Sequence, residues 1–150
     1  MKARTLAAAA AALLLLATAT PAHADESVHP DIAAMLLEVP GGEPLGYYAA
    51  YWPVLDMTME VPNPMLRTVG GCATGYICAF TAGGATGGNK LSWGTCSTAT
   101  IPTNFLTASV ANARAAGSVA QARVATTIIA SVSAGSWKNV SGIDNIRCLE

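Results

Sequence analysis

Four cysteines constrain the fold of this chain more than any other feature of its sequence. They stand at Cys72, Cys78, Cys96 and Cys148, so the consecutive spacings are 6, 18 and 52 residues. Zinc sites use paired short knuckles that these spacings lack, and an even number of cysteines in an exported chain predicts disulfides. Four cysteines allow three pairings. We favour Cys72–Cys78, which closes a short turn, with Cys96–Cys148, which ties the end of the chain to its middle.

The N-terminal residues predict export. Lys2 and Arg4 precede an unbroken run of Ala and Leu at residues 6–16, and small residues flank the position after Ala24. This is the pattern of a secretory signal peptide. The apolar run is shorter than the ~20 residues that span a bilayer. We therefore expect a signal peptide at residues 1–24 and a secreted protein without a membrane span; the alternative is a retained N-terminal anchor.

Cleavage after Ala24 leaves 150 − 24 = 126 residues, which suits one modest hydrophobic core. The leader holds two of the eight basic residues and none of the nine acidic ones, so the remainder has a net charge of 6 − 9 = −3 with histidine neutral. Such a domain lacks the basic surface that binds nucleic acid or an anionic membrane. We expect a monomer with no nucleic-acid partner, made of an N-terminal extension (residues 25–64) and a domain (residues 65–150).

The extension predicts one short helix and one strand. Pro30 and Asp31 suit a first helical turn, and residues 41 and 42 are glycines that end the pattern. The apolar residues between them recur at helical spacing: Ile32, Met35, Leu36 and Val39. We therefore expect a helix over residues 30–38. At residues 57–61 apolar and polar side chains alternate, which predicts a strand.

The part that bears the cysteines predicts further strands. Residues 77–81 and 90–93 form a β-hairpin pattern around a glycine-rich loop that we expect to be mobile, and because no helix follows the glycines we expect no phosphate site. Residues 111–122 are rich in alanine, which alone favours a helix. Gly117 interrupts that stretch, however, and residues 124–132 are β-branched and alternating, so we predict strands in both.

Two further expectations concern side chains in these strands. We expect Ile128, Ala130 and Val132 to share one face of their strand. We also expect Trp93 and Trp137 to be buried in the core, because each stands in a strand-like segment beside alternating apolar residues.

Catalytic chemistry is sparse in this sequence. His29 is the one histidine left after cleavage, and the G-x-S-x-G, HExxH, EF-hand and dinucleotide motifs do not occur. Seven of the nine carboxylates stand at or before Glu60, which leaves Asp144 and Glu150 for the rest of the chain. A paired-carboxylate acid/base site in the cysteine-bearing part is therefore not expected. We predict no enzymatic activity, no cofactor and no metal site.

Several motifs resemble the actinobacterial secreted proteins grouped with the Streptomyces metalloproteinase inhibitor. The opening runs from Cys72 through Gly75 to Cys78, with Phe80 two residues later. A glycine-rich turn at 87–88, a Leu-Ser-Trp strand at 91–93 and Cys96 follow, and 51–53 and 109–112 also resemble segments of that family. The resemblance covers about 100 residues, from near Tyr51 to Cys148. The sequence departs from the family at Ala73, where proline is usual.

The resemblance implies an all-β fold, a small Greek-key β-sandwich like a βγ-crystallin domain, here with one short N-terminal helix and stapled by disulfides. It also implies inhibition of metallopeptidases, with a secreted peptidase as the partner. The acidic calcium motif of many βγ-crystallins is absent at residues 107–110, so we expect no calcium site.

Three classes of function stay open at this point: a peptidase inhibitor, a secreted or envelope-associated binding module without inhibitory activity, and an enzyme. An inhibitor presents a rigid extended loop, because a flexible loop loses affinity when it becomes ordered. Two segments qualify, and residues 82–89 are the poorer candidate because the glycine-rich loop is expected to be mobile. Our candidate is the segment that leaves Cys96, residues 97–104, with Ser97, Ile101, Pro102 and Asn104 as candidate contacts. Pro102 restricts the backbone there, and Ile101 and Phe105 are candidates to fill a peptidase pocket. The alternative is an ordinary loop whose Ile101 and Phe105 point into the core.

Overall fold

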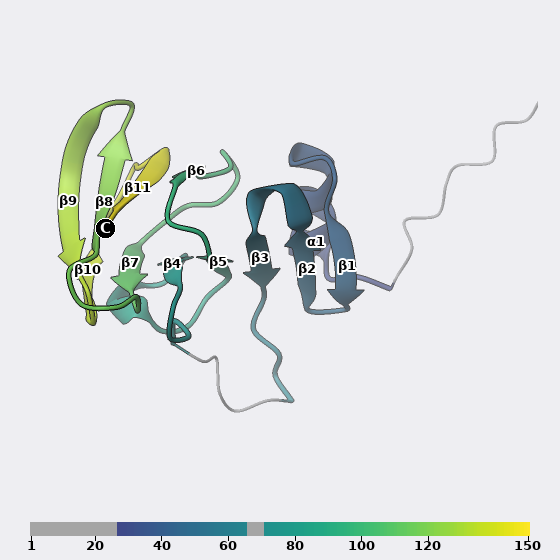
Figure 1. Cartoon of the computed structure of the whole chain (residues 1–150). Helices are drawn as coiled ribbons and strands as arrows, with labels where there is room; N and C mark the ends of the chain where they lie inside the picture. The colour runs from purple at the N-terminus through teal and green to yellow at the C-terminus, as the bar shows by residue number, and fades with distance from the viewer. Residues whose placement is uncertain (1–26, 66–70) are drawn as a thin grey trace, which may run out of the picture.

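The computed structural model describes residues 27–65 and 71–150, so the predicted signal peptide lies outside the described residues (Figure 1). The described chain is mostly β, with two antiparallel sheets, one short α-helix and two disulfides. This confirms the predicted fold class at that level. The two-sheet arrangement is consistent with a Greek-key sandwich. No helix among the described residues is long and apolar enough to cross a membrane.

The longer sheet has seven strands in the order β1-β2-β3-β5-β4-β7-β10, and the shorter sheet has four in the order β6-β11-β8-β9. The strands of the longer sheet are β1 Glu43–Gly46, β2 Ala49–Trp52, β3 Met57–Glu60, β4 Ile77–Phe80, β5 Lys90–Trp93, β7 Ser109–Asn112 and β10 Ser136–Asn139. Those of the shorter sheet are β6 Thr98–Thr100, β8 Val119–Val124, β9 Thr127–Ser133 and β11 Asn145–Leu149. The helices are α1 Pro30–Glu38 and the 3₁₀ turns η1 Pro53–Leu55 and η2 Gly83–Ala85.

Helix α1 has the predicted bounds. His29 caps it, because its Nδ1 accepts a hydrogen bond from the Asp31 backbone N–H at 3.2 Å. Ile32 and Met35 are fully buried and dock the helix on the sheet. The only histidine of the described residues therefore has a structural role at the start of this helix.

The extension and the cysteine-bearing part share one sheet. β3 pairs with β5 through the register Met57↔Trp93 to Glu60↔Lys90, and β1 and β2 continue the sheet outward. The short strands β1 and β2 were not predicted, because neither has a clear alternating pattern. The longer sheet therefore contains strands from both sides of the predicted boundary between residues 64 and 65.

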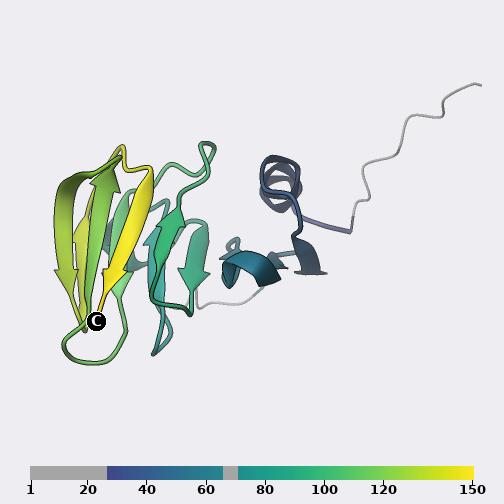
Figure 2. The same ribbon diagram turned by 45° about the horizontal axis from the view of Figure 1, so that its top comes forward.

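The buried residues form two clusters, and the larger one contains residues of both sheets and of α1. The residues of this larger cluster come from every part of the described chain, and the largest include Trp52, Met57, Met59, Leu91, Val110, Val132 and Ile146. Figure 2 shows the shorter sheet at one end of the molecule and α1 at the other. Trp93 is 4% exposed, as predicted.

The predicted hairpin is present, because β4 and β5 pair antiparallel from Ile77↔Trp93 to Phe80↔Lys90. The glycine-rich loop between them is held by hydrogen bonds. Gly84 N–H donates to Asn139 Oδ1 at 2.9 Å and Ala85 N–H donates to Ser109 Oγ at 3.0 Å. These contacts tie the loop to β10 and β7, against our expectation of a mobile loop.

Residues 111–122 contain parts of β7 and β8 and no helix, as predicted. The stretch 124–132 is not one strand, because the chain turns at Ala125, whose φ is 52°. Both Asp144 carboxylate oxygens accept the Ala125 N–H at 2.9 Å, and this long-range contact holds the left-handed conformation. A bulge in the β8–β9 pairing interrupts the alternation of side chains between Ile128 and Val132. Ile128 is therefore 47% exposed and does not share the buried face of Val132.

The prediction that Trp137 lies in the core is wrong. Trp137 is 52% exposed on β10, whose four residues are all exposed. β10 is the last strand of the longer sheet, and within residues 27–65 and 71–150 it pairs with β7 alone. An edge strand leaves side chains uncovered that a central strand buries, so local alternation alone does not predict that Trp137 is exposed.

Candidate functional site

Residues 97–104, which we call the contact segment, contain the candidate contacts predicted from the sequence. The segment begins after Cys96, forms β6 and then turns at Pro102, where Phe105 N–H donates to Pro102 O at 3.0 Å. It lies at the edge of the shorter sheet, where β6 pairs with β11 (Figure 1). Both of its ends are anchored to distant parts of the chain.

The disulfide Cys96–Cys148 anchors the start of the contact segment. It joins residues 52 apart in sequence, and Cys72–Cys78 is the second disulfide, so the structure contains both pairings that we favoured. Cys148 N–H also donates to Ser97 O at 2.9 Å. A covalent link therefore holds the residue just before the segment, and a backbone hydrogen bond from the same strand holds the first residue of the segment.

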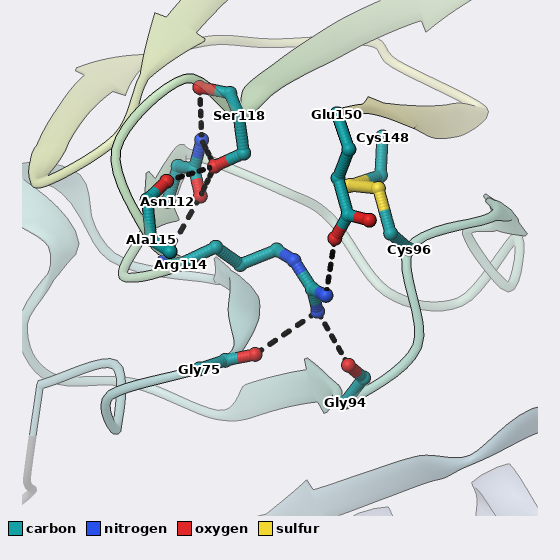
Figure 3. Close-up of polar contacts among 9 residues, drawn as sticks. All are labelled: Gly75, Gly94, Cys96, Asn112, Arg114, Ala115, Ser118, Cys148 and Glu150. Atoms are coloured by element: carbon teal, nitrogen blue, oxygen red, sulfur yellow. Dashed lines mark hydrogen bonds and ion pairs between the residues drawn. A yellow bond between two sulfur atoms is a disulfide. The ribbon is translucent and has the colours of Figure 1, made fainter.

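An arginine lies beside this disulfide and braces the chain that leads to it (Figure 3). Arg114 Nη1 donates to the backbone oxygens of Gly94 and, at 3.0 Å, of Gly75, and Nη2 bonds Glu150 Oε1 at 2.7 Å. The side chain of Arg114 is 16% exposed. Charge-assisted bonds at such a site are among the stronger polar contacts in proteins. Gly94 and Glu150 each stand two residues from a cysteine of the disulfide.

The turn that carries Arg114 is itself held by a buried amide. Asn112 is 1% exposed, and its Nδ2 donates to Val132 O at 3.1 Å and to Ser118 O at 3.3 Å, while its Oδ1 accepts the Arg114 N–H at 3.2 Å. Ser118 Oγ donates to Ala115 O at 2.9 Å and closes the turn (Figure 3). This network fixes the direction of the Arg114 side chain.

Glu38, the last residue of α1, anchors the other end of the contact segment. Its carboxylate accepts hydrogen bonds from the Thr103 N–H, from Thr103 Oγ1 at 2.7 Å and from the Asn104 N–H at 3.3 Å. The Thr103 hydroxyl contributes most to lowering the pKa of Glu38 below its ordinary value. The carboxylate is therefore ionised at neutral pH and holds two successive backbone amides.

The two side chains that are our candidates to fill a peptidase pocket are both buried. Ile101 lies within the segment and Phe105 just beyond it, and each is 4% exposed and belongs to the core. Pro102 is also buried. Any partner therefore meets the exposed residues instead, which are Ser97, Thr98, Thr100, Thr103 and Asn104. The identification of this segment as a contact with a peptidase stays a prediction.

Sequence reasoning missed the turn η1, which lies beside the contact segment and exposes two apolar side chains. Val54 is 95% exposed and Leu55 is 46% exposed. The start of this short turn is held in place by Trp52, which precedes it. Trp52 is buried, and its Nε1 donates a hydrogen bond to Val39 O at 2.7 Å. Pro53 starts the turn, and Asp56 ends it in a left-handed conformation. The signal available in the sequence is a proline followed by two apolar residues.

Two hollows separate η1 from the contact segment. One, of about 240 Å³, is lined by Val54, Leu55, Trp93, Thr95 and residues 97–100. The other, of about 260 Å³, is lined by Glu38, Val39, Leu55, Met57 and residues 100–103. The hollows follow one another along the segment and share Leu55 and Thr100. We call the two together the β6 groove.

Two of the carboxylates in the cysteine-bearing part have structural partners. Asp144 is used at the Ala125 turn, and Glu150 is paired with Arg114. One group of potential metal ligands, Cys96, Cys148 and Glu150, lies within 4.8 Å, but its two sulfur atoms are joined to each other and offer no thiolate. The chemistry of the site is that of hydrogen bonding and apolar contact.

Comparison with protein-family models, with curated proteins and with solved structures finds no significant match to this chain. The resemblance to the secreted metalloproteinase inhibitors therefore depends on the cysteine, glycine and aromatic residues of the sequence. The two disulfides are compatible with an extracellular protein.

Proposed function

We propose that this chain is a secreted, non-enzymatic inhibitor of metallopeptidases that meets its target through the contact segment and the neighbouring η1 turn. One observation carries the proposal: the contact segment has exposed side chains and an anchored backbone. Cys96–Cys148 holds its start, β11 pairs with its middle, and Glu38 holds its end. We infer the class of the target, the metallopeptidases, from the resemblance in sequence.

Anchoring matters because a segment that is already ordered loses little conformational entropy when it binds. Ile101 N–H donates to Asp144 O at 2.8 Å and fixes the centre of the contact segment as well. An inhibitor also needs apolar side chains within reach of the target, and Val54 and Leu55 supply them beside the segment. The combination of a fixed polar backbone and exposed apolar neighbours suits a peptidase surface.

The test is to titrate the secreted protein, purified after export, against a thermolysin-like metallopeptidase and to follow cleavage of a peptide substrate. Inhibition at near-stoichiometric protein is the expected result. Glu38→Gln should weaken it, because the neutral amide holds the Thr103 and Asn104 N–H groups less strongly than the carboxylate does. Glu43→Gln is the matched control, since exposed Glu43 lies on β1, the edge strand of the longer sheet, whereas the contact segment belongs to the shorter sheet.

The proposal is wrong if the folded protein inhibits neither this peptidase nor other metallopeptidases at stoichiometric excess. A binding module without inhibitory activity is the second candidate, and the β6 groove favours it. A groove beside an open strand can hold a polypeptide without offering any bond for cleavage.

A further inference from the structure

The outer edge of β6 presents backbone groups without partners. Cys148 N–H donates to Ser97 O and Ile101 N–H donates to Asp144 O, so Ser97 and Ile101 face β11. In an antiparallel pair of strands, every second residue directs its backbone N–H and C=O groups toward the neighbouring strand. Thr98 and Thr100 therefore direct their N–H and C=O groups away from β11, and among the described residues no strand pairs with that side of β6.

The β6 groove lies along this open edge. The lining of its first hollow includes Thr98 and Thr100 of β6 and Val54 and Leu55 of η1. Each hollow is smaller than the roughly 300–1,000 Å³ of a typical small-molecule pocket. Unpaired donors and acceptors at strand spacing are matched by the backbone of another extended chain, which is how an exposed sheet edge recognises a peptide.

The chemistry of the groove selects an uncharged segment. Glu38 is the one charged residue that lines either hollow, and its carboxylate is already bonded to Thr103 and Asn104. The remaining lining residues are apolar or carry hydroxyl groups. A charged side chain would lose hydration here without gaining a partner, whereas an apolar one gains contact with Leu55.

We propose that the β6 groove binds an extended, uncharged apolar segment of the target, which adds to the shorter sheet as a strand beside Thr98 and Thr100. The inference rests on the proposed function for the source of that segment, which is the chain of a peptidase. A second copy of this protein fits the groove less well. In each copy Val54 and Leu55 stand beside the β6 edge, so these side chains would meet their counterparts before the two edges could pair.

The probe is the blocked peptide acetyl-Thr-Val-Leu-Val-Thr-amide, added to the ¹⁵N-labelled secreted protein. We expect slower hydrogen exchange at the Thr98 and Thr100 amides. The Ser131 and Ser133 amides on β9 are internal controls, because Ala134 N–H donates to Ser118 O and places them on the other open edge. The same peptide with every backbone amide N-methylated should give no protection, since it cannot donate.

Two variants test the same contact. Leu55→Ser should weaken binding of the peptide roughly five- to tenfold through lost apolar contact. Ile129→Ser should leave binding unchanged, because Ile129 is similarly exposed, at 48%, but lies on β9. Both side chains are about half exposed, so both variants are expected to fold.

Several outcomes overturn the inference. These are equal protection of the β6 and β9 amides, protection by the N-methylated peptide, or protection that rises with protein concentration without peptide and so reveals self-association. Inhibition of a peptidase without protection of Thr98 and Thr100 overturns this inference but leaves the proposed function standing. Protection by the peptide without any inhibition contradicts the proposed function and supports a peptide-binding edge.

Discussion

Loss of Cys96–Cys148 should destabilise the domain more than loss of Cys72–Cys78. The two disulfides form a matched pair for this comparison. Each links a buried cysteine, Cys148 at 8% exposed or Cys78 at 0%, to a partly exposed one, so similar burial is lost in each case. They differ in the length of chain that they close, with sequence separations of 52 and 6 residues.

The expected difference follows from the entropy of the unfolded chain. A cross-link restricts the unfolded state more when it closes a longer loop. The relation gives about 4 kcal/mol for the longer loop and about 2 kcal/mol for the shorter one, so the two losses should differ by about 2 kcal/mol. That difference is a large fraction of the stability of a small domain, which is about 5–15 kcal/mol.

The measurement is urea unfolding of two double variants, Cys96→Ala/Cys148→Ala and Cys72→Ala/Cys78→Ala, beside the parent protein. Tryptophan fluorescence reports the transition, because Trp52 lies in the core. A slope of about 1–3 kcal/mol per M urea converts the difference into a gap of about 1 M between the two midpoints. Equal losses, or a greater loss from Cys72–Cys78, would refute the argument from loop length.

Three further perturbations have defined outcomes. Gly42→Ala should lower the free energy of unfolding by about 1–3 kcal/mol in urea titrations, because its Cβ would overlap the indole of Trp52; an unchanged midpoint would contradict this. The lowered pKa of Glu38 means that its contribution is complete above pH 4.5 and is lost as the pH falls below that value, so thermal unfolding of Glu38→Gln should show a smaller acid-induced loss than the parent protein. Arg114→Gln should cost about 1.5–3 kcal/mol in urea titrations, since two backbone oxygens lose a charged donor.

The parts of the fold that were predictable are those in which local pattern and packing agree. The helix over residues 30–38 has a proline start, helical spacing and a glycine end, and β3, β4 and β5 have compact apolar patterns. The turn at Ala125 has no glycine or proline to announce it. It depends on the Asp144 carboxylate, which stands 19 residues away in sequence, so no local pattern contains it.

The candidate site was predictable in position but not in detail. Cys96 and Pro102 marked the contact segment, because a disulfide and a proline both restrict the backbone. The sequence does not tell which side of β6 is open, because that depends on the register with β11. Nor does it place Glu38 or Leu55 beside the segment, since both come from the extension, which joins the rest of the longer sheet through the pairing of β3 with β5.

Several long-range contacts anchor the contact segment, although the domain does not depend on them for most of its stability. The two sheets already bury a continuous apolar core, which supplies most of the stability of such a domain. Even so, the hydrogen bonds of Arg114 and the disulfide Cys96–Cys148 lie at one end of the contact segment, which has eight residues. Glu38 binds its other end. Connecting segments at a surface are usually more mobile than the elements that they join, and function is often found on loops that a rigid scaffold positions. The anchoring of this segment is therefore a physical reason to look for the partner there, and weakening each anchor separately should reduce binding before it unfolds the domain.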